Sequence, residues 1–380
     1  MHYFLIAGEA SGDLHGADLV SAIRQIDRDA VISFFGGDKM AVAAGHEPLM
    51  HYRRMNFMGF SEVLRNIGKV AANLSAAKNA VEMASPDALI LIDYPSFNLK
   101  VGAYAAKLGI PVYYYISPKI WAWKKWRIRD IRRYVRRVFS ILPFEPAFYR
   151  ANGGNAEYVG NPSVAEIARQ LASAPSREEF LERHKLRDRP MIALMPGSRR
   201  GEIRNNLPIM REASDRFPRY RAIITGAPGV PDAVYAASGA GTIPIVREEH
   251  TAHILCHCRG ALVTSGTATL ETALAGVPQV VMYRANGSKL SYGIMSRILD
   301  VEHVSLPNLI VGRTVVPELL LHLCTPGAAA GALAPLLDEQ SAAFKTQMQG
   351  YADMKAALGD GDAAANTARR IVDECMAKKA

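Results

Sequence analysis

Residues 2–26, HYFLIAGEASGDLHGADLVSAIRQI, carry the pattern that decides the fold. A short apolar run over residues 2–7 ends at Gly8, a turn of small residues follows, and then comes a segment with helical periodicity. Near-continuous apolar strands that alternate with helices are typical of parallel sheets covered on both faces. The stretch therefore predicts an α/β fold that opens with a strand, a glycine turn and a helix.

The alternation of strand and helix recurs in two series along the chain. Further strands of the first series are predicted over 31–37, 87–93 and 111–117, before the pattern breaks near Gly160. A polar helix follows, and a second series of apolar strands then begins. Its members are predicted over 191–199, 221–226, 241–246, 260–266 and 278–284.

Two such series predict two doubly wound, Rossmann-like domains facing across a cleft. Ligands are then expected at the carboxyl ends of the strands of both sheets. We expect a first domain over 1–160 and a second over 161–345. A C-terminal helical tail is expected over 346–380, with packing back on the first domain as one option.

Composition limits the classes of function. The chain has 45 Lys and Arg against 36 Asp and Glu, a net charge of +9, so its surface favours anions such as phosphate, nucleotide, nucleic acid or acidic lipid. Four cysteines suit a reducing compartment better than a disulfide framework. The sequence has no signal-peptide pattern and no uncharged stretch of the ~20 residues needed to span a bilayer. We therefore expect a cytoplasmic protein.

Two acids, Glu9 and Asp13, lie in the glycine-rich turn GEASGDLHG. Such turns after a first strand usually cradle a phosphate, which carboxylates would repel. Carboxylates suit sugar hydroxyls better, because an ionised acid accepts hydrogen bonds from them. Glu9 comes before any helix begins and is the stronger ligand candidate. For Asp13, capping of a helix N-terminus remains an equal alternative.

Asp93 directly follows the apolar strand in DALILIDYPSFN, and Pro95 prevents that strand from continuing. We expect it at the carboxyl edge of the first sheet. A carboxylate there could act as a general base on a substrate hydroxyl, helped if burial raises its pKa. The alternative is an aspartate that only initiates the turn.

Residues 119–137 hold nine basic residues and one acid, together with three tryptophans. A solvated helix face, a nucleic-acid surface and a site for phosphorylated or membrane-bound lipid all fit this composition. The apolar stretch MNFMGF at 55–60 favours lipid, with packing in the core as the alternative. The residues expected to face a membrane are Met55, Phe57, Met58, Trp121, Trp123, Lys124 and Lys125.

Two turns in the second half combine groups that bind anions. PGSRRGEI supplies backbone N–H groups, a hydroxyl and a guanidinium through Gly197, Ser198 and Arg199. In SGTATLE, backbone amides can hold a diphosphate while Glu271 accepts from ribose hydroxyls. The alternative for Glu271 is a first-turn acid favoured by the helix dipole. The candidates in this second turn are Ser265, Gly266, Thr267, Thr269 and Glu271.

Two clusters resemble metal sites and are interpreted otherwise. Three histidines between residues 250 and 257 stand beside Cys256 and Cys258, but no second cluster with zinc-like spacing accompanies them. The acids of DGD at 360–362 lie between helical runs, where capping is the expected role. We predict no metal and no cofactor.

Nine motifs in order resemble those of the lipid-A-disaccharide synthase family, bacterial glycosyltransferases with the two-domain GT-B fold. The motifs are GEASGDLHGA, FMGFSEVL, IDYPSFN, SPKIWAWK, LPFEPAFY, GSRRGEI, SGTATLE, SLPNL and VPELL. The resemblance implies an inverting transfer of the sugar of UDP-2,3-diacylglucosamine to the 6-hydroxyl of 2,3-diacylglucosamine 1-phosphate, with release of UDP. It also implies that the protein is a peripheral membrane protein, which acts at the anionic cytoplasmic face of the inner membrane.

By the same resemblance, Asp93 matches the proposed general base, and Glu9, Arg199 and Asn308 match functionally important positions. Asp93, Glu9 and Asn308 are the catalytic candidates. The family often reads D-x-P-D-F where residues 93–97 of this chain read DYPSF, so a second acid is absent from that loop. A mechanism that needs two carboxylates there is therefore in doubt for this chain.

Two other functions stay open. Another UDP-sugar enzyme of the same architecture, an epimerase or a peptidoglycan-precursor transferase, is compatible with the fold, since one fold hosts many chemistries. A nucleic-acid-binding module would use the basic segment, and its binding would weaken with salt and ignore UDP. We expect no nucleic-acid partner and leave assembly as a homodimer open.

Overall fold

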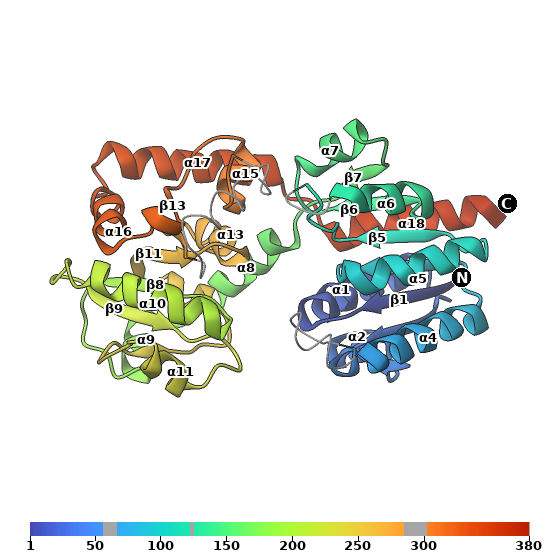
Figure 1. The fold of residues 1–380 in the computed structure, drawn as a ribbon, viewed down its shortest axis with the longest axis horizontal. Coiled ribbons are helices and arrows are strands. Elements are labelled where there is room, and N and C mark those ends of the chain that lie inside the picture. Colours follow the sequence, from blue (N-terminus) through green and yellow to red (C-terminus); the bar gives the residue numbers. More distant parts are fainter. Residues whose placement is uncertain (56–66, 122–124, 285–301, 380) are drawn as a thin grey trace. The chain divides into compact units, whose positions relative to one another are not determined.

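The computed structural model of the chain describes residues 1–55, 67–121, 125–284 and 302–379. They form two compact units, one of Met1–Pro162 with Asp360–Ala380 and the other of Ser163–Gly359. Each unit contains one sheet, and all paired strands in both sheets are parallel. Helices cover the sheets, as Figure 1 shows, so both units have the α/β class that the sequence predicts.

The first unit is built on a seven-stranded sheet with the order β3-β2-β1-β4-β5-β6-β7. Its strands are β1 (His2–Ala7), β2 (Val31–Gly36), β3 (Met50–His51), β4 (Ala88–Ile92), β5 (Val112–Tyr115), β6 (Arg137–Ser140) and β7 (Ala156–Tyr158). The direction of strand order reverses between β1 and β4, which pair up to Ala7 and Ile92. Ligands of such sheets bind outside the carboxyl ends of the strands at this switch point.

Both faces of the first sheet are buried, which explains the continuous apolar runs. Along β1, Tyr3 and Leu5 lie in one core cluster, and Phe4 and Ile6 lie in another. The helices of this unit are α1 (Ala10–Ile26), α2 (Asp38–Ala44), α4 (Ile67–Ala84), α5 (Pro95–Lys107), α6 (Ile128–Tyr134), α7 (Glu145–Ala151) and α18 (Ala363–Lys379). Two 3₁₀ turns, η1 (Tyr52–Arg54) and η2 (Lys125–Arg127), complete it.

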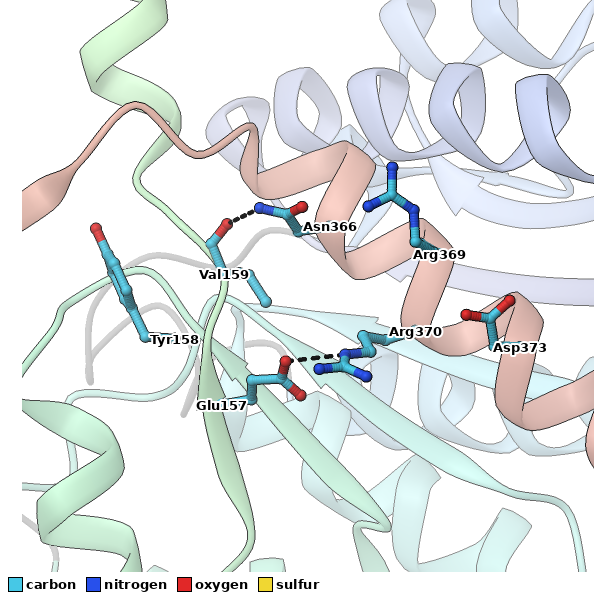
Figure 2. Close-up of a pocket in the computed structure, with 7 residues that line it drawn as sticks. All are labelled: Glu157, Tyr158, Val159, Asn366, Arg369, Arg370 and Asp373. Carbon is cyan, nitrogen blue, oxygen red and sulfur yellow. Dashed lines mark hydrogen bonds and ion pairs between the residues drawn. The ribbon is translucent and has the colours of Figure 1, made fainter.

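The C-terminal helix α18 belongs to the core of the first unit. Its Ile371 and Val372 are fully buried in the cluster that contains α1 residues. Figure 2 shows the polar contacts between α18 and β7, where Arg370 donates to Glu157 at 2.9 Å. A pocket of about 370 Å³ lies between these elements. The expected tail over 346–380 is divided, because the preceding helix α17 (Ala342–Leu358) belongs to the second unit.

The second unit has a six-stranded sheet with the order β10-β9-β8-β11-β12-β13. Its strands are β8 (Met191–Met195), β9 (Arg221–Thr225), β10 (Ile245–Val246), β11 (Cys258–Thr264), β12 (Gln279–Tyr283) and β13 (Glu318–Leu320). The switch point lies between β8 and β11, which pair up to Met195 and Val263. The turns after these two strands, with Gly197 and Ser265, therefore emerge side by side.

The helices of the second unit lie before its first strand, between its strands and after the last of them. They are α8 (Pro162–Ala172), α9 (Arg177–Arg183), α10 (Arg200–Ser214), α11 (Asp232–Ala237), α12 (Ala252–Leu255), α13 (Thr267–Leu274), α15 (Leu306–Val311), α16 (Pro326–Leu333) and α17. Two 3₁₀ turns, η3 (Leu321–Leu323) and η4 (Ala334–Leu337), join them. The apolar pattern does not predict β3, β6, β7 and β13, which are at most four residues long.

Candidate active site

The switch point of the first sheet brings Glu9 and Asp93 to one edge. Gly8 and Glu9 follow β1, and Asp93 follows β4, directly after the last paired residues Ala7 and Ile92. Glu9 is half-buried and accepts a hydrogen bond from the Ser11 hydroxyl at 2.9 Å. The two carboxylates are close enough for the charge of Glu9 to act on Asp93.

The backbone at Asp93 is held in an unusual conformation. Asp93 and Tyr94 both have left-handed backbone angles, with φ of 44° and 49°. Such residues cost about 1–3 kcal/mol each and persist only where neighbours hold them. Asn98 does so by donating to the Asp93 carbonyl at 2.7 Å, and the Tyr114 hydroxyl donates to the same carbonyl at 2.5 Å. The turn that carries Asp93 is thus fixed from two sides.

A close approach between the two turns explains why the first one needs glycine. A Cβ atom on Gly8 would lie only 2.3 Å from the Tyr94 ring. The Tyr94 hydroxyl in turn donates to the Met55 carbonyl at 2.9 Å. Any larger residue at position 8 would therefore displace the turn that carries Asp93.

Burial raises the pKa of Asp93 to about 6, and the nearby negative charge of Glu9 adds to this shift. The Lys119 ammonium and a backbone hydrogen bond from Tyr94 oppose it. A carboxylate with a pKa just below neutrality is ionised at pH 7 and still basic enough to take a proton. The site can therefore supply a general base.

Asp13 is a brace and not a ligand candidate. Its side chain is buried, and its Oδ1 accepts from the N–H groups of Gly37 at 2.7 Å and Met40 at 3.1 Å. Its Oδ2 accepts from Lys39 N–H at 3.1 Å. Of the two roles left open for Asp13, the structure supports capping, although the helix that it caps is α2 and not its own.

Ser96 stands where the family often has a second acid. Its Oγ accepts a hydrogen bond from Arg127 Nη2 at 2.8 Å, and the Arg127 side chain is buried. Ser96 therefore helps to hold the Arg127 guanidinium in place.

Two of the residues expected to face a membrane are buried. Met55 is 2% exposed and packs in a core cluster with Phe4, and Trp121 is 9% exposed and donates to Glu145 at 2.9 Å. This corrects the expectation that their side chains lie at the surface. Phe57, Met58, Trp123 and Lys124 lie outside the described residues, and Lys125 begins η2.

The basic segment does not form one face. Arg127 is buried, Arg136 and Arg137 pair with Glu374 of α18, and Trp126 is 61% exposed. None of the helices in the described parts of the chain has the length and the apolar composition of a membrane span. Some side chains of the basic segment therefore stabilise the fold, as Arg127 and Arg137 do, and others such as Trp126 are exposed to solvent.

The first anion turn of the second unit already contains a carboxylate. The N–H groups of Ser198 and Arg199 donate to Glu202 Oε2 at 3.1 and 3.3 Å, and Arg199 Nη1 donates to its Oε1 at 2.8 Å. Gly197 has φ of 111°, and a Cβ there would lie 2.5 Å from the same carboxylate. A phosphate at this turn would have to share these donors with Glu202, while most of Arg199 is exposed.

The second anion turn follows β11. Ser265 is half-buried, and Gly266 and Thr267 are exposed at the start of α13. Thr269 is fully buried, donates to the Gly266 carbonyl at 2.8 Å and accepts from Leu306 N–H, so it supports the turn from below. Burial raises the pKa of Glu271, with a contribution from Glu166.

Asn308 is a fully buried brace of the SLPN segment. Its Oδ1 accepts from the N–H groups of Val315 and Val316, and its Nδ2 donates to Glu318 at 2.8 Å. Glu318 also accepts from Ser305 N–H at 2.9 Å and from its hydroxyl at 2.6 Å. Because these bonds use both ends of the Asn308 amide, we interpret it as a residue that positions the segment. Sequence reasoning missed Glu318, although VPELL is one of the motifs.

The metal-like clusters have other partners. His253 is buried beside the Ser173 hydroxyl, and His257 packs on the Phe180 ring. Asp362 accepts from Ala365 N–H at 3.0 Å at the start of α18, which is the expected capping role. Across the ranges that the structure describes, no group of three or more His, Cys, Asp or Glu side chains could hold a metal ion.

Solved structures define the class of the fold. A UDP-GlcNAc 2-epimerase from Neisseria meningitidis, bound to UDP-GlcNAc, is 12% identical with a TM-score of 0.66, and the match covers 100% of both chains. The calicheamicin glycosyltransferase is 15% identical with a TM-score of 0.58, covering 100% of this chain and 99% of the other. At such identities the likeness shows the fold alone, which is the GT-B fold of two parallel-sheet units.

The family follows from the sequence itself. The sequence model described as lipid-A-disaccharide synthetase matches residues 3–372. A lipid-A-disaccharide synthase of Myxococcus xanthus is 39% identical over 97% of this chain and 96% of that protein. One from Geobacter metallireducens is 36% identical over 99% and 97%. The chain belongs to the lipid-A-disaccharide synthetase family and is a glycosyltransferase, as the nine motifs predict.

Proposed function

We propose that the enzyme condenses UDP-2,3-diacylglucosamine with 2,3-diacylglucosamine 1-phosphate, giving the lipid A disaccharide 1-phosphate and UDP. Membership of the family supports this choice of substrates. The observation that carries the proposal is the Asp93 carboxylate at a switch point, with a pKa of about 6 and a fixed turn. This is the group that a glycosyl transfer to a hydroxyl needs.

In the proposed reaction, ionised Asp93 takes the proton from the 6-hydroxyl of the acceptor. The hydroxyl oxygen forms a bond to the anomeric carbon of the donor while the bond from that carbon to the diphosphate breaks. UDP leaves with the electron pair, and the configuration at the anomeric carbon inverts. Residue 96 is a serine that accepts a hydrogen bond from Arg127, so Asp93 is the one carboxylate of this loop that the mechanism uses. Glu9 accepts hydrogen bonds from sugar hydroxyls and orients the acceptor.

The second unit is proposed to hold UDP. Its switch point offers the exposed guanidinium of Arg199, the N–H groups of Ser198 and Arg199, which a diphosphate would share with Glu202, and the Gly266 turn at the start of α13. A diphosphate suits donors at helix N-termini. Glu271 is proposed to accept from the ribose hydroxyls, and Asn308 acts on the site through the Glu318 brace. No metal or other cofactor is part of the proposal.

We also propose that the protein works at an anionic membrane surface, the cytoplasmic face of the inner membrane. Both substrates carry acyl chains that are costly to expose to water. In the described residues, the exposed Trp126 and the exposed Arg132 and Arg133 are the groups suited to such a surface. Each basic residue near an anionic surface contributes about 1 kcal/mol. Assembly as a homodimer stays a prediction.

A product assay tests this function. Purified protein is incubated with both substrates in mixed micelles, and the products are analysed by mass spectrometry. We expect the disaccharide 1-phosphate and one UDP for each disaccharide, with chelation of divalent ions leaving the rate intact. UDP formed without disaccharide, or an isomerised donor sugar, would instead assign a hydrolase or an epimerase.

A further inference from the structure

A buried carboxylate anchors the loop that follows β5. Glu145, at the start of α7, is 1% exposed and accepts from three side chains. Ser117 and Ser140 hydroxyls donate to its Oε2 at 2.6 and 2.5 Å, and Trp121 Nε1 donates to its Oε1 at 2.9 Å. Two of these donors, Ser117 and Trp121, are the ends of the segment 117–121. Glu145 therefore fixes both ends of this segment.

The fixed segment carries Lys119 beside the candidate base. Strands β4 and β5 pair at Ile92 and Tyr115, and Asp93 N–H donates to the Tyr115 carbonyl at 3.2 Å. The segment leaves β5 through Ile116, whose φ of 63° turns the chain. The Lys119 ammonium is near enough to attract both the Asp93 and the Glu145 carboxylates.

The side chain of Lys119 is exposed, so the loop backbone has to hold it in place. An exposed lysine is flexible, and its position depends on where its Cα atom is fixed. A carboxylate that accepts from three donors inside the fold is a rigid anchor for that purpose, because leaving these groups unpaired would be costly. The position of Lys119 thus depends on Glu145, which holds both ends of the segment that carries it.

We propose that Lys119 holds Asp93 in the ionised form that a base needs, and that Glu145 positions Lys119 by anchoring residues 117–121. Both are positioning residues, since they act through Asp93. The inference deepens the proposed function and rests on Asp93 as the base. In the sequence, Lys119 is one of nine basic residues in 119–137 and Glu145 is one acid of LPFEPAFY, so no local pattern distinguishes either residue.

The groups that surround Asp93 come from several elements. Glu9 approaches from the turn after β1 and Lys119 from the loop after β5, while Tyr94 supplies a backbone N–H. Tyr114 of β5 donates to the Asp93 carbonyl. Among the described residues, the charged side chains that act on Asp93 are therefore one acid, which favours its protonated form, and one base, which opposes it.

The test is the pH dependence of kcat/KM for disaccharide formation. In wild type, the rate should fall on the acidic side with a midpoint near pH 6. Lys119→Met should raise that midpoint by roughly half a unit to one unit, because a favourable charge is lost. The rate below the midpoint then drops about three- to tenfold, while the rates converge at high pH. Glu9→Gln should move the midpoint the other way.

A double-mutant comparison tests the role of Glu145. Glu145→Gln keeps the shape of the side chain and leaves no buried charge, and we expect it to raise the midpoint like Lys119→Met. Combined with Lys119→Met it should add no further shift, because Glu145 acts through Lys119. Glu374→Gln is the matched control: it breaks the pairs with Arg136 and Arg137 in the same unit, and should leave the midpoint unchanged.

The outcomes separate this inference from the proposed function. If Lys119→Met lowers the rate by one factor at every pH, Lys119 contributes to binding only and the inference fails. If the midpoint shifts of Lys119→Met and Glu145→Gln add in the double variant, Glu145 does not act through Lys119, and its part of the inference fails. If wild type makes no disaccharide, or Asp93→Asn keeps the full rate, it is the base assignment that fails.

Discussion

The two switch points of the molecule use carboxylates in opposite ways. At the first, Asp93 is short of donors, partly buried and next to a second acid, and its pKa rises to about 6. In the second sheet, Glu202 beside the switch point accepts from two backbone N–H groups and the Arg199 guanidinium. Glu318 on the edge strand β13 accepts from backbone N–H groups and from the Ser305 and Asn308 side chains. We infer that the first edge provides the base and that the acids of the second edge hold loops in place.

The largest expected effect is on turnover, and it would break this comparison if it failed. Asp93→Asn keeps the shape of the side chain but cannot take a proton. We expect the rate of disaccharide formation to fall about 10²–10⁴-fold, the usual contribution of a general base. Its affinity for UDP, measured by calorimetry, should stay within about twofold of wild type. Turnover close to wild type under conditions where chemistry limits the rate would exclude Asp93.

The second prediction concerns the braces of the second edge. Asn308→Ala leaves the buried N–H groups of Val315 and Val316 without their acceptor and removes one donor of Glu318. It should lower the free energy of unfolding by about 2–4 kcal/mol. The matched control is Asn205→Ala, which removes one long hydrogen bond to the Arg284 carbonyl at 3.4 Å and should cost less than about 1 kcal/mol. Equal losses in denaturant titrations would mean that Asn308 is no brace.

The third prediction uses the raised pKa of Asp93. The folded state holds its proton up to about pH 6, whereas the unfolded chain releases it near 4, so the stabilising contribution is lost as pH rises between these values. Asp93→Asn removes that loss and should be more stable than wild type by about 1–3 kcal/mol at pH 7.5. At pH 4 the gap should close. A gap that does not change with pH would contradict the raised pKa.

The smallest effect concerns nucleotide binding. Arg199→Ala should weaken UDP binding about tenfold, since a hydrogen bond to a charged group contributes about 1.5 kcal/mol. Glu9→Ala is the comparison variant, because its side chain lies in the other unit, and its UDP affinity should be unchanged. The reverse ranking by calorimetry would exchange the roles of the two units.

Sequence patterns predict the strands whose burial is complete on both faces. β1, β4, β5 and β8 appear where near-continuous apolar runs place them. β6 escapes prediction because its four residues, RVFS, begin inside the basic segment and complete a sheet through long-range pairing. The division of the C-terminal helices also depends on packing that no local pattern records, such as Ile371 and Val372 in the core of the first unit.

The candidate site was predictable where chemistry follows directly from position. Asp93 and Glu9 each follow the carboxyl end of a strand, and parallel topology brings such ends together at one edge. The sequence does not distinguish an acid that lacks donors from one that has several, as Asp13, Glu145 and Glu318 illustrate, because their partners lie 5 to 28 residues away. Met55 and Trp121 were predicted at the surface for a similar reason: a local apolar stretch does not reveal which side of it is covered.

The ionisation of Asp93 can be measured directly, and this tests the contrast between the two edges most simply. The carboxyl carbon is followed by NMR in protein with labelled aspartate, and Asp93→Asn identifies the signal by its loss. We expect the Asp93 signal to titrate with a midpoint of about 6, well above the ordinary value for an aspartate. A midpoint at or below about 4 would mean that burial does not raise the pKa of Asp93, and would contradict its assignment as the base.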